Sequence, residues 1–167
     1  PSVAAMQGRT DLRVQTVALP EVRFVAFNMA KPPWDDLRMR RALSCAVDRA
    51  ELVRLAWDGL AEPLYQPLPP AIWGHNPDLD AASCHYDAGR ARAELQALGY
   101  VDIDGDGLRE APDGHPWVVR LSTGPEDVWR RQAEVLAAQF RDVGVGLKVE
   151  CLDYGALTTL GSQGEHE

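Results

Sequence analysis

Apolar and polar positions along the chain predict strands and helices in alternation. Residues 13–19 and 21–28 are apolar runs of strand length, separated by Pro20. In the second run the apolar side chains fall on both faces of an extended chain, which is typical of a strand buried in a sheet. Two later runs, 116–122 and 145–152, predict strands in the second half of the chain.

Between these runs, apolar residues at helical spacing predict helices with recognisable ends. Three helices are expected in the first hundred residues, each after an aspartate suited to capping its first turn: Asp35 or Asp36, Asp48 and Asp87. A fourth helix runs from Pro125 to about Val143, and a short final one begins near Asp153 or Tyr154. The pattern therefore predicts a mixed α/β domain.

The stretch from residue 61 to residue 80 fits no regular element because prolines interrupt it: Pro63, Pro67, Pro69, Pro70 and Pro77. Its apolar residues indicate a loop packed on the domain. Structured loops of this length are often functional.

Composition limits the class of protein. The chain has 167 residues and 46% hydrophobic residues, which suits one ordinary globular domain. Its formal net charge of −8 argues against a nucleic-acid partner, since phosphates require a basic surface. No apolar run is long enough to span a bilayer, and the chain has neither an initial methionine nor a signal-peptide core.

The cysteines are Cys45, Cys84 and Cys151, with no Cys-x-x-Cys pair among them. This spacing predicts neither a zinc site nor a disulfide framework. We interpret all three as small buried hydrophobic residues.

An Asp/Gly segment resembles the start of a twelve-residue calcium loop, with aspartates at positions one, three and five and glycine at six. The candidate ligands are Asp102, Asp104, Asp106, Glu110 and Asp113. Arg109 at position eight and an aspartate at position twelve depart from the pattern. The alternative is a tight turn whose carboxylates accept hydrogen bonds from their own backbone amides.

Signatures of common enzymes are absent from the sequence: it has no Gly-x-Ser-x-Gly, no phosphate-binding loop, no dinucleotide fingerprint and no His-Glu-x-x-His. We therefore expect a protein without catalysis and without a cofactor. A hydrolase with an unrecognised pair of carboxylates stays open as an alternative.

The five tryptophans are candidates for lining a pocket. Trp129 is the best placed, because it lies in the first turn of a helix that follows a strand, where α/β domains often bind ligands. Trp57 and Trp117 are expected in the core.

Several segments, taken in order, carry a family resemblance: Phe27 to Arg49, Pro67 to Pro70, Trp73 to Asp78, Tyr86 to Tyr100 and Asp102 to Gly107. Together they resemble family 5 extracellular solute-binding proteins, the peptide and oligopeptide receptors of ABC importers. The resemblance covers about residues 22–160. Each motif alone is loose, and the resemblance is specific because all of them occur in the order found in the family.

The resemblance implies that residues 1–167 are a single domain, excised from the C-terminal-type lobe of a larger receptor. The implied fold is an α/β lobe of a type II periplasmic-binding-protein-like clamshell, with a mixed sheet flanked by helices. The implied partners are a peptide or other small solute, held together with the other lobe, and an ABC permease. The implied location is periplasmic or extracellular, with the full-length protein associated with the membrane.

By the same resemblance, the loop after the strand ending at Thr123 lies beside the ligand cleft. The ligand-binding residues it implies are Thr123, Gly124, Glu126, Asp127 and Trp129, with Asn28 a weaker candidate. The alternative function is a structural or adhesive module stabilised by calcium at the 102–113 loop.

Overall fold

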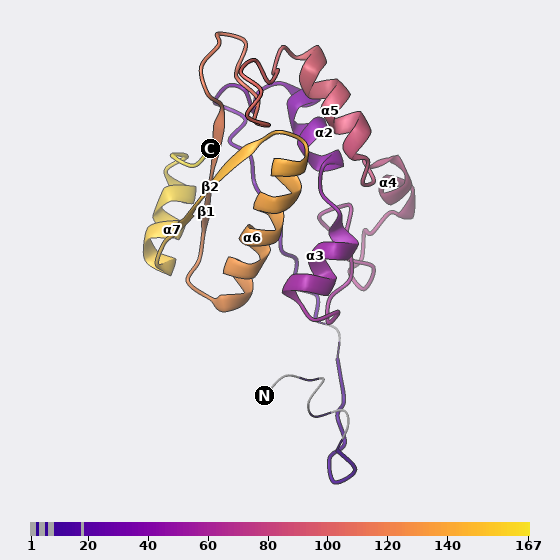
Figure 1. Ribbon diagram of the computed structural model, residues 1–167. Coiled ribbons are helices and arrows are strands. Elements are labelled where there is room, and N and C mark those ends of the chain that lie inside the picture. Colours follow the sequence, from indigo (N-terminus) through magenta and orange to yellow (C-terminus); the bar gives the residue numbers. More distant parts are fainter. Residues whose placement is uncertain (1–2, 4–5, 7–8, 18) are drawn as a thin grey trace.

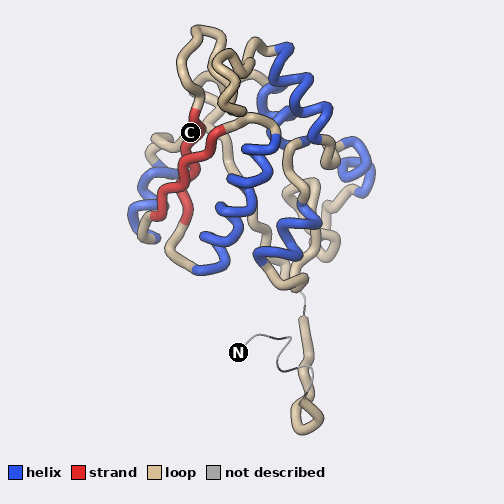
Figure 2. Tube along the Cα trace, in the orientation of Figure 1, coloured by secondary structure: helices blue, strands red, loops and turns tan. Residues whose placement is uncertain are grey.

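The computed structural model describes residues 3, 6, 9–17 and 19–167. The fold combines helices with a pair of strands (Figures 1 and 2), so the α/β prediction is confirmed. The elements, in order, are α2 (Leu37–Cys45), α3 (Arg49–Ala56), α4 (Pro77–Ala82), α5 (Ala88–Ala97), β1 (Val118–Thr123), α6 (Asp127–Asp142), β2 (Gly146–Cys151) and α7 (Tyr154–Ser162).

The two strands form a parallel pair, with Val118 beside Gly146 and Thr123 beside Cys151. Helix α6 connects them and packs against both. Figure 1 shows α6 and α7 on opposite sides of the strands. Since the strands are parallel, their carboxyl ends lie together at one edge of the pair.

The main core lies where α2 packs against α5. Met39, Leu43 and Leu95 are fully buried there. An aromatic cluster extends this core: the Trp34 ring, 3% exposed, lies 5.1 Å from the Phe27 ring and 6.4 Å from the Trp117 ring, measured between centroids. Trp117 is half-buried and packs against the buried core residues.

The predicted N-caps are present as well. Asp36, Asp48 and Asp87 each accept a backbone N–H of the first turn, at the starts of α2, α3 and α5. Gln139 of α6 is buried and bonds both backbone groups of Asp48, so it joins α6 to the start of α3.

The two N-terminal strands are a wrong prediction. Residues 13–17 and 19–28 contain no strand, and position 18 lies outside the described residues. Val17 and Phe24 are largely exposed, and Figure 1 shows the first part of the chain extending away from the helices. A strand needs a hydrogen-bonded neighbour, and in the described part of the chain none pairs with these residues.

Helix α4 is a second correction, since it begins within the stretch expected to have no regular element. Asn76 caps it by accepting the N–H of Asp78, and Pro77 takes the first helical position. Asparagine followed by proline is a helix-start signal, because proline loses no hydrogen bond at that position.

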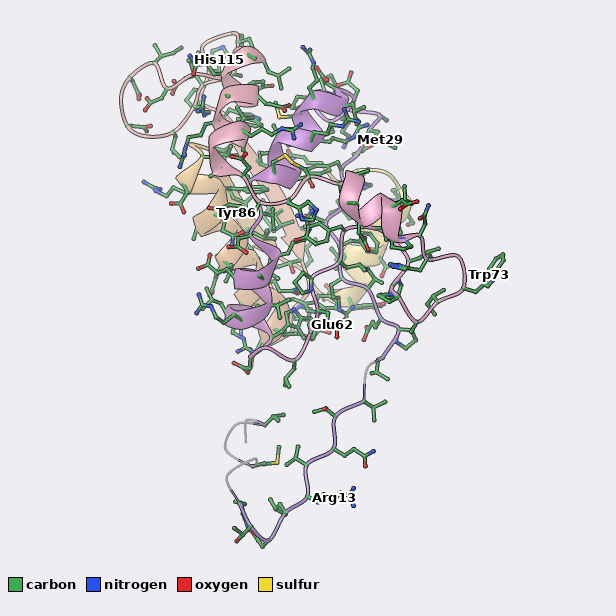
Figure 3. The ribbon with its side chains drawn as sticks, turned by 90° about the vertical axis from the view of Figure 1, so that its right-hand side faces the viewer. Arg13, Met29, Glu62, Trp73, Tyr86 and His115 are labelled. Atoms are coloured by element: carbon green, nitrogen blue, oxygen red, sulfur yellow. A yellow bond between two sulfur atoms is a disulfide. The ribbon has the colours of Figure 1, made fainter. Side chains whose placement is uncertain are left out.

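The interpretation of the cysteines as buried hydrophobic residues is correct for Cys45, which is fully buried, but it missed a disulfide and is wrong for Cys151. Cys45 and Cys84 form a disulfide (Figure 3), with their Cα atoms 5.2 Å apart. Cys151 is exposed. Packing of α2 against α5 brings the end of α2 close to the residues before α5, where the Asp87 N–H bonds the Cys45 carbonyl at 2.9 Å. This proximity arises from tertiary structure, so the spacing of the cysteines did not reveal it.

Among the described residues, no helix combines the length and the apolar character needed to cross a membrane.

Candidate ligand-binding surface

The carboxyl ends of β1 and β2 form the surface that we call the carboxyl edge, made of residues 123–129 and 151–154. Thr123 and Cys151 end the two strands side by side. The Leu152 N–H donates to the Thr123 carbonyl at 2.9 Å, so the pairing continues just beyond the strands. Open α/β sheets bind their ligands at this kind of edge.

Trp129 is held against the backbone of Gly124. A methyl group added at Gly124 would lie 2.0 Å from two atoms of the Trp129 six-membered ring, so the indole occupies the space beside that Cα atom. The Arg23 guanidinium lies over the same indole, 5.1 Å from its centre. This geometry fits a cation–π contact.

The start of α6, the helix that carries this indole, also carries two carboxylates. Glu126 is the N-cap residue of α6 but makes no side-chain capping bond, and Asp127 pairs with Arg130 one turn later. This hydrogen bond raises the pKa of Arg130 above its ordinary value. An aromatic face beside an exposed carboxylate suits a ligand with an apolar part and a cationic group.

The structure thus brings together five of the six residues implied by the family resemblance: Thr123, Gly124, Glu126, Asp127 and Trp129. Asn28 lies elsewhere and is buried. Its side-chain amide donates to the carbonyls of Gly164 and His166, at 2.8 and 2.9 Å. These bonds tie the residues that precede α2 to the C-terminal residues.

Sequence reasoning missed two neighbours of the carboxyl edge. The Cys151 thiol donates to the Gly124 carbonyl at 3.2 Å, and it reaches this position because Cys151 pairs with Thr123. Predicting which strands pair would have revealed it. Arg23 comes from a distant segment, and nothing in the sequence marks it as a partner of Trp129.

The Asp/Gly segment lies apart from this surface and satisfies its own backbone. The oxygens of Asp102 accept the N–H groups of Gly105 and Gly107 at 2.7 and 3.0 Å. The buried Glu110 accepts the Ile103 N–H at 2.7 Å. These bonds are those of the alternative reading, a tight turn.

Of the five calcium candidates, three have carboxylate oxygens within 4.8 Å of one another: Asp102, Asp104 and Asp106. Asp113 instead accepts the His115 N–H at 3.1 Å. A calcium site at this loop stays a prediction.

Comparison with known proteins supports the resemblance seen in the sequence. All of residues 1–167 match the model for bacterial extracellular solute-binding proteins, family 5 middle region. The chain belongs to this family. It is a family of binding proteins, so the expectation of a protein without catalysis is confirmed.

Several relatives of this family 5 chain carry names that mention a ligand. It is 26% identical over 161 residues to the dipeptide-binding protein of Escherichia coli K12, covering 95% of this chain and 28% of that protein. It is 28% identical over 151 residues to heme-binding protein A of Haemophilus influenzae, covering 87% of this chain and 25% of that protein.

A solved structure supports the fold. The oligopeptide-binding protein AppA of Bacillus subtilis, in complex with a nonapeptide, matches with a TM-score of 0.73 and 28% identity, over 80% of this chain and 26% of AppA. The family 5 chain thus spans about a quarter of the length of these relatives.

Proposed function

We propose that this chain forms part of one lobe of a receptor that captures a solute outside the cytoplasm for import by an ABC transporter. The observation that carries the proposal is the indole of Trp129 at the carboxyl edge, in a chain that matches the family over its whole length. Two-lobed receptors close around their ligand, so this surface would supply one wall of the closed site.

Peptides are the ligand class that we favour. Trp129 offers an apolar face for a ligand's side chain. The carboxylate of Glu126, which makes no capping hydrogen bond, offers a partner for a peptide's amino group. The names of the relatives add support, since one is a dipeptide-binding protein and another was solved with a nonapeptide. Heme, named for a third relative, is the competing ligand.

The disulfide supports a location outside the cytoplasm. Cys45 and Cys84 are joined, and such bonds persist in oxidising compartments such as the periplasm. We propose that the full-length receptor is periplasmic or extracellular, associates with the membrane and delivers its solute to an ABC permease.

The test is ligand identification on the full-length receptor, purified gently and examined by native mass spectrometry. A series of bound masses that match peptides would support the proposal. A single bound mass equal to that of heme would show that the ligand is heme and not a peptide. A receptor that carries nothing and then binds neither a peptide mixture nor heme would contradict it.

The Trp129→Ala variant tests whether the ligand binds at the carboxyl edge. We expect its affinity for the identified ligand to fall roughly fivefold to tenfold, since the aromatic contact is worth about 1–1.4 kcal/mol. Trp73→Ala is the matched control, because the Trp73 side chain is 97% exposed and points away from the fold (Figure 3). Equal affinities of the two variants would contradict the assignment.

A further inference from the structure

Gly124 contacts the Trp129 indole more closely than any residue with a side chain could. Its virtual Cβ lies 2.0 Å from the ring atoms Cε3 and Cζ3, whereas an ordinary contact requires at least 3.4 Å. Any larger residue at this position would therefore have to push the indole outward or change the loop.

Space is the reason for glycine here, not backbone conformation. The φ angle of Gly124 is not among the left-handed values that disfavour other residues, whereas Gly144, at the end of α6, has φ +82°. An alanine could adopt the backbone of Gly124, but its methyl group would meet the indole at 2.0 Å and the end of the Glu126 side chain, Oε2, at 2.8 Å.

The surroundings limit the ways in which the loop could give way. Gly124 is buried, and its carbonyl accepts the Cys151 thiol. The Arg23 guanidinium covers the indole. With the loop bonded to the end of β2, the indole is the part that has to move, outward from Gly124.

We infer that Gly124 is a specificity-determining residue: the absence of a side chain lets the Trp129 indole sit back against the loop and leaves room for a large ligand side chain. This inference rests on the proposed function. It adds that the closeness of the Gly124–Trp129 contact sets the size of the apolar group that the receptor accepts at the carboxyl edge.

The contact itself is tested without ligand, by 19F NMR of the full-length receptor labelled with 5-fluorotryptophan. The Trp129 signal is assigned from its loss in Trp129→Leu. We expect Gly124→Ala to shift this signal, because the indole must move away from residue 124. Gly161→Ala is the control, since nothing lies within 4 Å of its virtual Cβ, and it should leave the signal unchanged. An unmoved Trp129 signal in Gly124→Ala would overturn the inference.

The effect on specificity is tested by calorimetry with the dipeptides Ala-Ala and Ala-Trp. Gly124→Ala should weaken Ala-Trp at least about tenfold and Ala-Ala less than about threefold, as expected when a pocket loses the volume of a methyl group or more. Gly124→Ala/Trp129→Leu frees that volume, so it should regain preference for the larger dipeptide and show that the single variant is not merely misfolded. Equal losses for both dipeptides would overturn the inference.

The two proposals fail in different ways. If the unaltered receptor bound neither dipeptide, the peptide assignment would fall, while the NMR result would still decide whether the indole depends on Gly124. If the receptor bound both and Gly124→Ala left their ratio unchanged, the peptide assignment would stand and the role of Gly124 would fall.

Discussion

Two regions of this chain have similarly apolar sequences and opposite environments. In the helical region, where α2 packs against α5, Leu43 and Leu95 are completely buried. In the N-terminal segment, residues 9–17 and 19–26, Leu19 is 73% and Phe24 is 80% exposed. The helices have each other to pack against, whereas the extended segment has no strand beside it among the described residues. Apolar character alone therefore does not determine burial; a packing partner is also required.

The largest expected effect is a difference in stability between a mutation in the helical region and one in the N-terminal segment. Leu43→Ala should lower the free energy of unfolding by about 2–5 kcal/mol, since it removes buried methyl groups and leaves a cavity in a closed core. Phe24→Ala removes a larger side chain, but one that is mostly exposed, and should cost less than about 0.5 kcal/mol. Urea unfolding of both variants measures the difference.

The result for Phe24→Ala decides whether the N-terminal segment is exposed in solution. A cost above about 2 kcal/mol, similar to that of Leu43→Ala, would mean that the segment is buried in solution, and the contrast between the regions would disappear. Phe24→Leu serves as a further control, since it keeps an apolar side chain at the same position.

The disulfide should have the next largest effect, and it belongs to the helical region alone. Replacing Cys45 and Cys84 together by alanine should cost about 2–4 kcal/mol, because the bond restricts the unfolded chain over a separation of 39 residues. Thermal unfolding with and without a reducing agent checks this, and the reductant should affect only the unaltered chain.

Cys151→Ala is the matched control for the disulfide, because Cys151 is a free and exposed cysteine. Its expected cost is below about 1 kcal/mol, that of one weak thiol hydrogen bond to the Gly124 carbonyl. A loss as large as that of the paired replacement would indicate that the carboxyl edge, rather than the disulfide, limits stability.

Features encoded within a few residues were predictable from sequence. The caps Asp36, Asp48 and Asp87 each bond an amide two or three residues away, and the helices that follow them were expected where they lie. Strands β1 and β2 were also expected, because each is an apolar run bounded by proline, glycine or a capping residue.

Features that depend on distant segments were not predictable in the same way. The Cys45–Cys84 bond follows from the packing of α2 against α5, and the N-terminal strands failed for lack of a neighbour. At the carboxyl edge, the family resemblance pointed to Gly124 and Trp129. Their close contact could not be predicted, because no pattern of residue types specifies how near an indole lies to a backbone atom.

The smallest expected effect compares one carboxylate from each region. Asp36, at the start of α2, accepts hydrogen bonds from the side chain and the backbone N–H of Arg38, and these hold the pKa of its carboxyl below the ordinary value. Asp11, in the N-terminal segment, has its pKa lowered by a hydrogen bond from Arg9. Asp11 is exposed and Asp36 is half-buried, and only Asp36 caps a helix.

A lowered pKa in the folded state contributes stability above the unfolded pKa and loses it as pH falls through the folded value. Asp36→Asn keeps a good cap and removes this dependence, so its melting temperature should lie below that of the unaltered chain at pH 7. The two melting temperatures should converge as the pH falls below the ordinary pKa of aspartate. Asp11→Asn should follow the unaltered chain at every pH, because the Arg9–Asp11 pair caps no helix and can form equally well when the chain is unfolded. If Asp11→Asn instead showed the larger pH dependence, the N-terminal segment would have to be ordered by folding, and the contrast between the two regions would be wrong.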